Sequence, residues 1–148
     1  MVKINDIIQA QGERKILSIS PQSSVGDALE LIVKERIGAL PVFEGEDNLV
    51  GIITERDILW RMHKEGQDAL QRQVSDVMTA KVIVGVLDDD IEVAETFMTV
   101  NRFRHLPVMD GSKLVGMISI GDLVKSQIKN LKVQNRYLKD YITGKYPG

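Results

Sequence analysis

Two short stretches of the sequence place a hydroxyl side chain three residues before an aspartate. Thr54 precedes Asp57 in the first half of the chain, and Ser119 precedes Asp122 in the second half. Each pair follows an apolar run and opens a helical pattern, so both side chains are predicted at a helix start, beside backbone N–H groups that lack partners. There the hydroxyl and amides suit a phosphate, and the carboxylate suits both hydroxyls of a ribose.

The same residue types also form a capping box, in which the hydroxyl and the carboxylate satisfy the first amides of the helix. Such a box stabilises a helix by about 1 kcal/mol and needs no ligand. For one copy alone capping is the favoured interpretation, because the motif is so short. Its recurrence in both halves leaves the choice open, since a duplication also preserves a cap.

An internal duplication accounts for that recurrence. Residues 16–45 align with 82–111 at an offset of 66, and residues 49–59 align with 114–124 at an offset of 65, so one residue is lost in a turn. Both copies contain the run Leu-Pro-Val and, further on, Leu-Val-Gly. The sequence therefore predicts two similar structural units in tandem.

The hydrophobic pattern changes in the same order within each copy. The first copy predicts a short strand at 16–20, a helix capped by Ser24, paired strands at 39–43 and 49–53, and a helix after Thr54. One such unit is too small to bury a core alone, so the two are expected to pack sheet to sheet with pseudo-two-fold symmetry. The predicted fold class is α/β (α+β), with two β-α-β-β-α units in one module.

Apolar residues at helical spacing predict which helix faces are buried. Val33 and Val100 are assigned to the buried faces of the first helix in each unit. Three isoleucines predict a short N-terminal helix: Ile4, Ile7 and Ile8. The last helix is predicted to extend nearly to the Gly144 and Pro147 that end it, and to pack on a partner chain, because its apolar spacing continues: Leu131, Leu138 and Ile142.

These patterns divide the 148 residues into four segments. An N-terminal helix and lead-in cover residues 1–15, the first unit covers 16–73, the second unit covers 74–126, and an extended helix with a tail covers 127–148. The 43% hydrophobic and 27% charged residues are typical of one globular module.

Composition also excludes several classes of function. The chain has no cysteine, which removes thiol chemistry and suits a reducing compartment. The net charge of -2 gives no general attraction for nucleic acid or an anionic membrane, and no signal-like or membrane-spanning apolar stretch opens the chain. A cytoplasmic protein is expected. His63 and His105 are the only histidines and lack clustered ligands, so neither a metal site nor a catalytic set is expected, and the chain is not predicted to be an enzyme.

The combined motifs resemble those of the cystathionine β-synthase (CBS) domain family, whose tandem pairs are called Bateman modules. The resemblance rests on Asp-Val-Met-Thr at 76–79, on Leu-Pro-Val in each copy, on Gly-x-x-[Thr/Ser]-x-x-Asp entering each final helix, and on the closing residues 141–147. It implies adenosine-containing ligands, such as AMP, ADP, ATP, NAD(H) or S-adenosylmethionine, bound in clefts between the two units. It also implies a homodimer and a regulatory role.

Carried over residue by residue, the resemblance implies two sites. In the first, Asp57 holds ribose and Thr54 with Arg56 holds phosphate, while residues of the second unit enclose adenine, with Arg104 nearby: Thr79, Val84 and Phe103. In the second, Asp122 and Ser119 hold ribose and phosphate, with Arg104 and His105 beside them, while residues of the first unit face the base: Ser18, Ile37 and Gly38.

The two copies differ in charge near these sites. Arg56 corresponds to Gly121, and Arg104 corresponds to Gly38, so guanidinium groups suited to phosphate are unevenly distributed. We therefore expect unequal sites, with the Asp57 site favouring the more anionic ligand. The leading hypothesis is a non-enzymatic sensor of adenine nucleotides that regulates an unknown protein. The alternative is a structural adaptor that binds a partner protein and no nucleotide.

Overall fold

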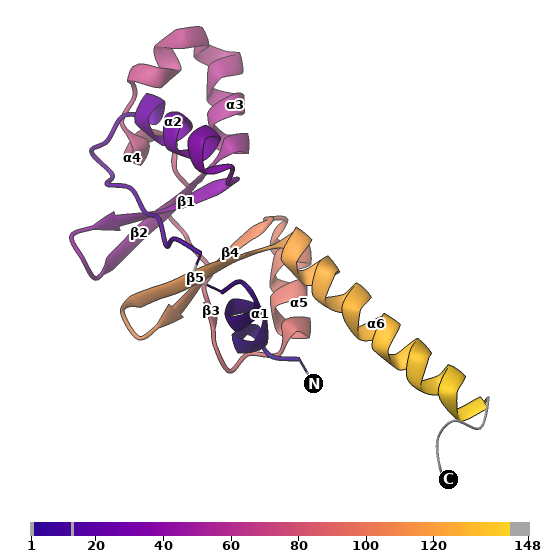
Figure 1. Cartoon of the computed structure of the whole chain (residues 1–148). Helices are drawn as coiled ribbons and strands as arrows, with labels where there is room; N and C mark the ends of the chain where they lie inside the picture. The colour runs from indigo at the N-terminus through magenta and orange to yellow at the C-terminus, as the bar shows by residue number, and fades with distance from the viewer. Residues whose placement is uncertain (1, 13, 143–148) are drawn as a thin grey trace.

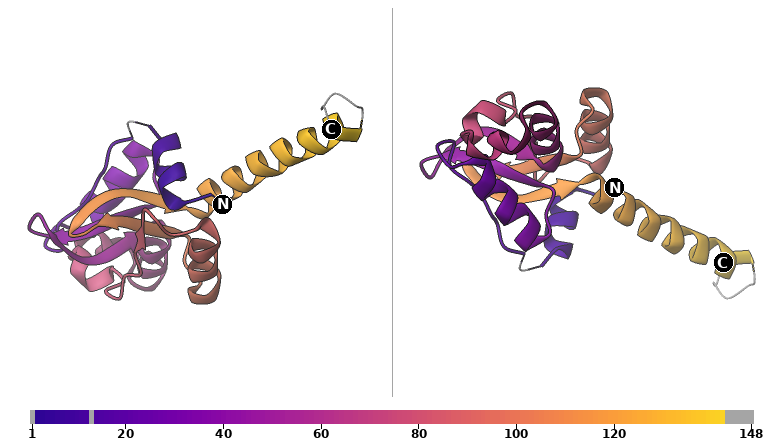
Figure 2. Two further views of the ribbon diagram at one scale, coloured as in Figure 1. Left: turned by 90° about the horizontal axis from the view of Figure 1, so that it is seen from below. Right: turned by 90° about the horizontal axis from the view of Figure 1, so that it is seen from above.

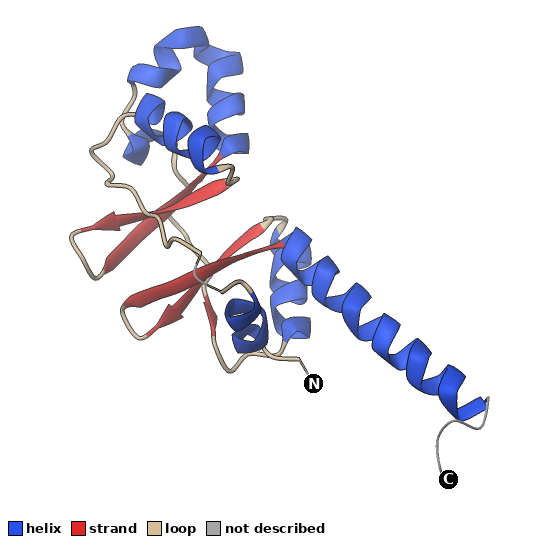
Figure 3. Cartoon of the chain, in the orientation of Figure 1, coloured by secondary structure: helices blue, strands red, loops and turns tan. Residues whose placement is uncertain are grey.

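The computed structural model describes residues 2–12 and 14–142 of the chain. Helices alternate with paired strands in the predicted order, and the strands of both units lie toward the middle of the molecule (Figures 1 and 3). The elements are α1 (Ile4–Ala10), α2 (Val25–Glu35), β1 (Ala39–Glu44), β2 (Asn48–Thr54), α3 (Glu55–Glu65), the 3₁₀ helix η1 (Gly66–Gln71), α4 (Val74–Val77), β3 (Gly85–Val86), α5 (Ile91–Asn101), β4 (His105–Asp110), β5 (Lys113–Ser119) and α6 (Ile120–Ile142).

The two predicted hairpins are confirmed and share one register. In β1 and β2 Leu40 pairs with Ile53, and in β4 and β5 Leu106 pairs with Ile118. The register of each hairpin shifts directly after the Leu-Pro-Val run, between Val42 and Phe43 and between Val108 and Met109. The same pattern of buried residues in both copies therefore produces the same hairpin.

The predicted strand at 16–20 is reduced to a single bridge. Ile19 pairs with Val42 in parallel, and its amide donates to the Pro41 carbonyl at 3.0 Å. The equivalent segment of the second unit forms the two-residue strand β3, parallel to β4. Both segments are therefore mostly extended chain, which leaves their side chains available to line cavities.

Two hydrophobic cores lie in the molecule, one in each unit. The first contains Val25, Leu40 and Ile58, and the second contains Met98, Leu106 and Leu123. Helix α1 is confirmed, and its buried Ile4 and Ile7 belong to the second core, although α1 precedes the first unit in the sequence. The lead-in must therefore cross back from the second unit to the first.

The predicted buried faces of α2 and α5 are partly wrong. Val33 is 68% exposed and Val100 is 72% exposed. The residues that reach the cores are Val25, Ala28 and Ile32 in α2, and Ile91, Ala94 and Met98 in α5. In each helix the fully buried residues follow one i, i+3, i+7 stripe, and apolar residues beside the stripe, such as Val33 and Val100, stay in solvent.

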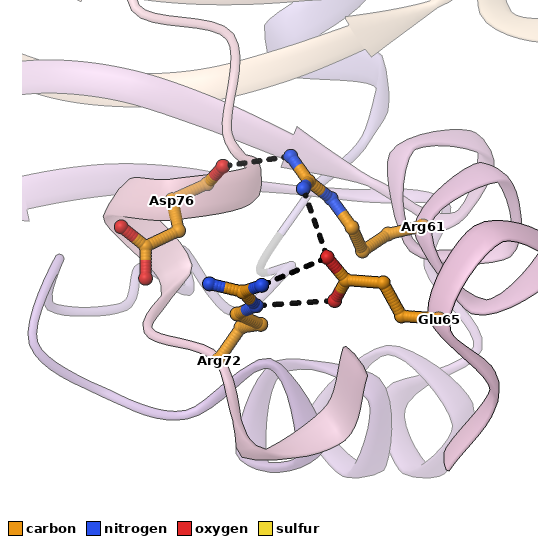
Figure 4. A network of polar contacts seen from close by, with 4 residues as sticks. All are labelled: Arg61, Glu65, Arg72 and Asp76. Atoms are coloured by element: carbon orange, nitrogen blue, oxygen red, sulfur yellow. Dashed lines mark hydrogen bonds and ion pairs between the residues drawn. The ribbon is translucent and has the colours of Figure 1, made fainter. Parts of the chain in front are cut away.

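Residues 66–77, for which the sequence predicted no secondary structure, form η1 and α4. Glu65 at the end of α3 accepts hydrogen bonds from Arg61 at 3.3 Å and from Arg72 at 2.9 Å, and Arg61 also donates to the Asp76 carbonyl at 3.0 Å (Figure 4). The Arg72 hydrogen bond lowers the pKa of the Glu65 carboxyl. This network ties α3, η1 and α4 together just before Thr79.

The long final helix is confirmed as α6, which extends away from the rest of the molecule in all views (Figures 1 and 2). The predicted helix end at Gly144 and Pro147, and the closing motif from residue 143 onward, lie outside the described residues. Within residues 2–12 and 14–142, no helix combines the length and apolar character that crossing a membrane requires.

Candidate functional site

Both hydroxyl–aspartate pairs form capping boxes. The Thr54 amide donates to Asp57 Oδ2 at 2.9 Å, and the Asp57 amide donates to Thr54 Oγ1 at 3.1 Å. The distances for Ser119 and Asp122 are the same. Capping therefore takes one oxygen of each carboxylate and leaves the second oxygen, Oδ1, for another partner.

The helix starts offer a phosphate fewer amides than the sequence suggested. The Glu55 amide donates to the Gly38 carbonyl at 2.9 Å, and the Ile120 amide donates to the Arg104 carbonyl at 3.0 Å. With the capping amides also engaged, two of the first three N–H groups in each helix are already paired. Basic side chains must therefore supply most of the donors for an anion at these positions.

A cavity of about 720 Å³ lies between the two units beside Asp57, and we call it the Asp57 cavity. Its volume is within the range of small-molecule sites. Six of the seven residues predicted for this site line it: Thr54, Arg56, Asp57, Thr79, Phe103 and Arg104. Val84 does not line the cavity, whereas Val82 and Ile83 do.

Asp57 lines this cavity and has one unpaired carboxylate oxygen. Within the described residues, its Oδ1 has no hydrogen bond or ion pair. Burial raises the pKa of the Asp57 carboxyl, and the hydrogen bonds from Thr54 oppose this effect. A half-buried carboxylate that makes no ion pair is costly for the fold, and such a cost is common at binding sites.

Two further cations, which sequence reasoning missed, line the Asp57 cavity. Lys81 and Arg102 join Arg56 and Arg104 there, while Glu55 and Asp57 are the carboxylates. Four cations against two carboxylates give the lining an excess of two positive charges. The arrangement suits a ligand with an anionic group, with apolar walls at Ile52, Val82, Ile83 and Phe103.

A second cavity of about 320 Å³ lies beside Asp122, and we call it the Asp122 cavity. Five of the predicted residues line it: Ile37, Gly38, His105, Ser119 and Asp122. Ser18 and Arg104 do not. Arg104 lines only the Asp57 cavity, so the expectation that it serves both sites does not match this geometry.

Ser18 and Val84 occupy equivalent positions in the repeat, and both miss their cavities in the same way. The residues that line the cavities instead come one or two positions earlier, Ile16 and Leu17 in the first unit and Val82 and Ile83 in the second. These segments are extended chain rather than regular strands, so strand alternation does not place their side chains.

The chain's own N-terminal lead-in contacts Asp122. Gln11 Nε2 donates to Asp122 Oδ2 at 3.2 Å and to the Met117 carbonyl at 3.2 Å. Arg14 Nη1 lies 3.8 Å from Asp122 Oδ1. Three cations, Arg14, Lys15 and Arg36, and one carboxylate, Asp122, line this cavity. The excess of two positive charges equals that of the Asp57 cavity, so the expected difference in charge between the sites does not appear in the net charge of the linings.

Comparison with known proteins assigns the family. The sequence model of the CBS domain matches residues 4–64 and 74–129. The chain belongs to the CBS-domain family. The CBS domain-containing protein YhcV of Bacillus subtilis is 32% identical over 130 residues, which cover 88% of this chain and 89% of YhcV.

Solved CBS-domain structures have the same fold. A CBS-domain containing protein from Agrobacterium tumefaciens is similar with a TM-score of 0.80 and 33% identity, over 85% of this chain and 99% of that one. The structure of CBSX2 in complex with AMP is similar with a TM-score of 0.71 and 28% identity, over 87% of this chain and 98% of that one.

Equivalent arginines in the two CBS units adopt a left-handed backbone. Arg36 ends α2 with φ 55°, Arg102 ends α5 with φ 57°, and each lines one cavity. This conformation is unfavourable for a residue with a side chain, and glycine is the usual choice at this position. The recurrence of arginine at this repeat offset was a signal in the sequence that could have identified both residues.

His105 lies between the two cavities and lines both. A Cβ atom on Gly38 would lie 2.7 Å from His105 Nε2, so the absence of a side chain at Gly38 gives the imidazole its place. Burial lowers the pKa of His105, while the carboxylates of Glu55 and Asp122 oppose this. Among the described residues, no group of three His, Asp or Glu side chains is placed to hold a metal ion.

Proposed function

We propose that this CBS pair is a regulatory module without catalytic activity that binds an adenine nucleotide in the Asp57 cavity. The carrying observation is the unpaired Oδ1 of Asp57, a residue that lines a cavity shared by both units. A ribose supplies two hydroxyl donors for such a carboxylate. CBSX2, whose structure contains AMP, supports an adenosine ligand.

The remaining lining divides by chemistry in a way that suits the other parts of a nucleotide. Phe103 and Ile83 form an apolar wall for the base, and Arg56 and Arg102 are cations for the phosphate. The amides at the start of α3 contribute little, because most are paired. We therefore propose that phosphate binding depends on side-chain cations and that affinity rises with ligand charge, in the order AMP, ADP, ATP.

The Asp122 cavity is proposed to bind the same ligands more weakly. Its volume is under half that of the Asp57 cavity, and Gln11 and Arg14 already contact its aspartate. A nucleotide would have to replace those contacts before its ribose reached the carboxylate. NAD(H) remains a candidate ligand of the module, with its second nucleotide half extending toward His105.

The experiment that tests this function is a ligand screen with the full chain. Calorimetry and thermal melting would compare AMP, ADP, ATP, NADH and S-adenosylmethionine, because any ligand that binds only the folded state raises the Tm. Binding of at least one, with a stoichiometry near one per chain, is expected. A chain that binds none of the five contradicts the proposal.

The contacts of Gln11 and Arg14 with Asp122 favour a second candidate, a structural adaptor that uses no nucleotide. If neither the Asp122 cavity nor the Asp57 cavity bound a nucleotide in solution, the module would act only through its exposed helices on a partner protein. The ligand screen separates the two candidates. For either role we propose a cytoplasmic location, which the cysteine-free sequence suits.

A further inference from the structure

Helix α6 extends beyond the body of the protein (Figure 2). It carries a row of exposed apolar side chains. Leu123, near its start, is the only buried residue of α6. Leu131 is 62% exposed and Ile142 is 74% exposed, and the rest of the row is exposed as well: Val124, Ile128 and Leu138. An isolated helix with such a stripe is rarely stable in water, which indicates that something covers it.

The spacing of this row is that of a coiled coil. The steps between successive members alternate between four and three residues: Val124, Ile128, Leu131, Asn135, Leu138 and Ile142. In heptad terms, isoleucine or asparagine occupies every a position, and valine or leucine occupies every d position. Isoleucine at a with leucine at d favours two parallel strands, and one asparagine at a fixes register and strand number.

We propose that the α6 helices of two copies of this chain pair in parallel as a two-stranded coiled coil. This pairing goes beyond the proposed function and does not depend on a nucleotide. Two observations select a second copy in parallel orientation over other arrangements. They concern Asn135 and the charged residues that flank the seam.

Asn135 finds its own partner only in the parallel arrangement. In a parallel pair the a positions face each other, so the two Asn135 amides hydrogen-bond across the seam. In an antiparallel pair an a position faces a d position, which places Asn135 against leucine or valine. A buried amide without a partner destabilises the pair.

The flanking charges favour the same orientation. The e positions are all lysines and the g positions are uncharged: Lys125, Lys132 and Lys139 at e, and Gln127, Gln134 and Tyr141 at g. Antiparallel helices would bring e against e and therefore lysine against lysine. Parallel helices bring e against g, where Gln127 also holds the Glu95 carboxylate at 2.7 Å, close to Lys132 of the second copy.

The opposite side of α6 already has an intramolecular neighbour. Ser126 and Val133, both at f positions, line a cavity between α6 and α1. The a and d positions therefore point away from α1. Since the seam is shorter than three heptads, we expect α5, which contacts α6 and exposes Val93 and Val100, to contribute the rest of the dimer contact.

Light scattering on the full chain, with seam and control variants, tests the pairing. Wild type is expected to be a dimer at micromolar concentration. Leu131→Lys combined with Leu138→Lys should weaken dimerisation at least tenfold, and Val133→Lys should not, with circular dichroism and thermal melting showing that both variants fold. A monomeric wild type, or a seam variant as dimeric as wild type, overturns the proposal.

Cysteine cross-linking tests the orientation, because the natural chain has no cysteine. Under oxidising conditions Asn135→Cys should form a disulfide-linked dimer rapidly, and Val133→Cys should not. Equal cross-linking of both variants contradicts a parallel in-register seam. A chain that stays monomeric in solution and binds vesicles of phosphatidylcholine and phosphatidylglycerol through α6 shows that the apolar row is a membrane surface, which also overturns the proposal.

Discussion

Gln11 donates a hydrogen bond to Asp122 at 3.2 Å, whereas the equivalent Asp57 has no partner from outside its own capping box among the described residues. The two aspartates have the same local geometry, with identical capping distances. Their difference comes from α1 and the lead-in, which contact Asp122 and have no counterpart beside Asp57 in the described part of the chain. A duplicated sequence has therefore produced one open carboxylate and one that the chain itself contacts.

Removing the Gln11 contact is predicted to open the second cavity to ligand. In an Asp57→Asn background, Gln11→Ala should raise nucleotide affinity at Asp122 several-fold, because a displaced hydrogen bond is worth about 0.5 to 1.5 kcal/mol. Gln9→Ala, on the exposed side of α1, is the matched control. Calorimetry that finds unchanged or weaker binding in the Gln11→Ala chain would show that Gln11 does not compete with the ligand.

The ionised Asp57 carboxylate is predicted to lower the stability of the unliganded chain at neutral pH. Because burial raises the pKa of this carboxyl in the folded chain, the folded state holds the proton more tightly than the unfolded state. Stability is therefore lost as the pH rises from the unfolded pKa through the folded pKa. Asp57→Asn, which cannot ionise, should have a higher Tm than wild type at neutral pH and a smaller advantage in acid.

A matched variant separates this effect from the general loss of a negative charge at a helix start. Asp27 occupies the same third position in α2 but is exposed and lies outside both cavities. Asp27→Asn removes an exposed carboxylate and should not raise the Tm at neutral pH. If the Tm advantage of Asp57→Asn does not depend on pH, the raised pKa is not its cause.

Gly38 is predicted to be intolerant of alanine because of His105. The added Cβ would lie 2.7 Å from Nε2 and 2.9 Å from Cε1 of the imidazole, so the ring that lines both cavities must move. Nucleotide affinity should fall several-fold. Gly121→Ala is the control, since its Cβ would meet only Ser119 Oγ at an ordinary 3.5 Å. Equal affinities in the two variants would mean that the position of His105 does not matter for binding.

The sequence predicted what depends on local spacing. The hairpin pairs Leu40 with Ile53 because alternation and a short turn leave one register. Thr54 and Asp57 form their cap because the two residues are three apart at a helix start. Such features need no knowledge of how the units meet.

Features that depend on tertiary packing were not predictable in the same way. Gln11 meets Asp122 across 111 positions of sequence, and Lys81 reaches the Asp57 cavity from an irregular segment with no periodic pattern. Val33 is exposed because an apolar residue beside a narrow buried stripe has the same helical spacing as one within it. The Gln11–Asp122 contact, the position of Lys81 and the exposure of Val33 all depend on long-range packing rather than on residue type.

Calorimetric titration of AMP and ATP into wild type, Asp57→Asn and Asp27→Asn tests nucleotide binding at Asp57 most directly. Asn keeps one acceptor for the cap but removes the charge and one ribose acceptor. We predict one strong site per chain, a loss of at least tenfold in affinity for Asp57→Asn, and wild-type affinity for Asp27→Asn. Equal affinity of all three proteins would contradict nucleotide binding at Asp57.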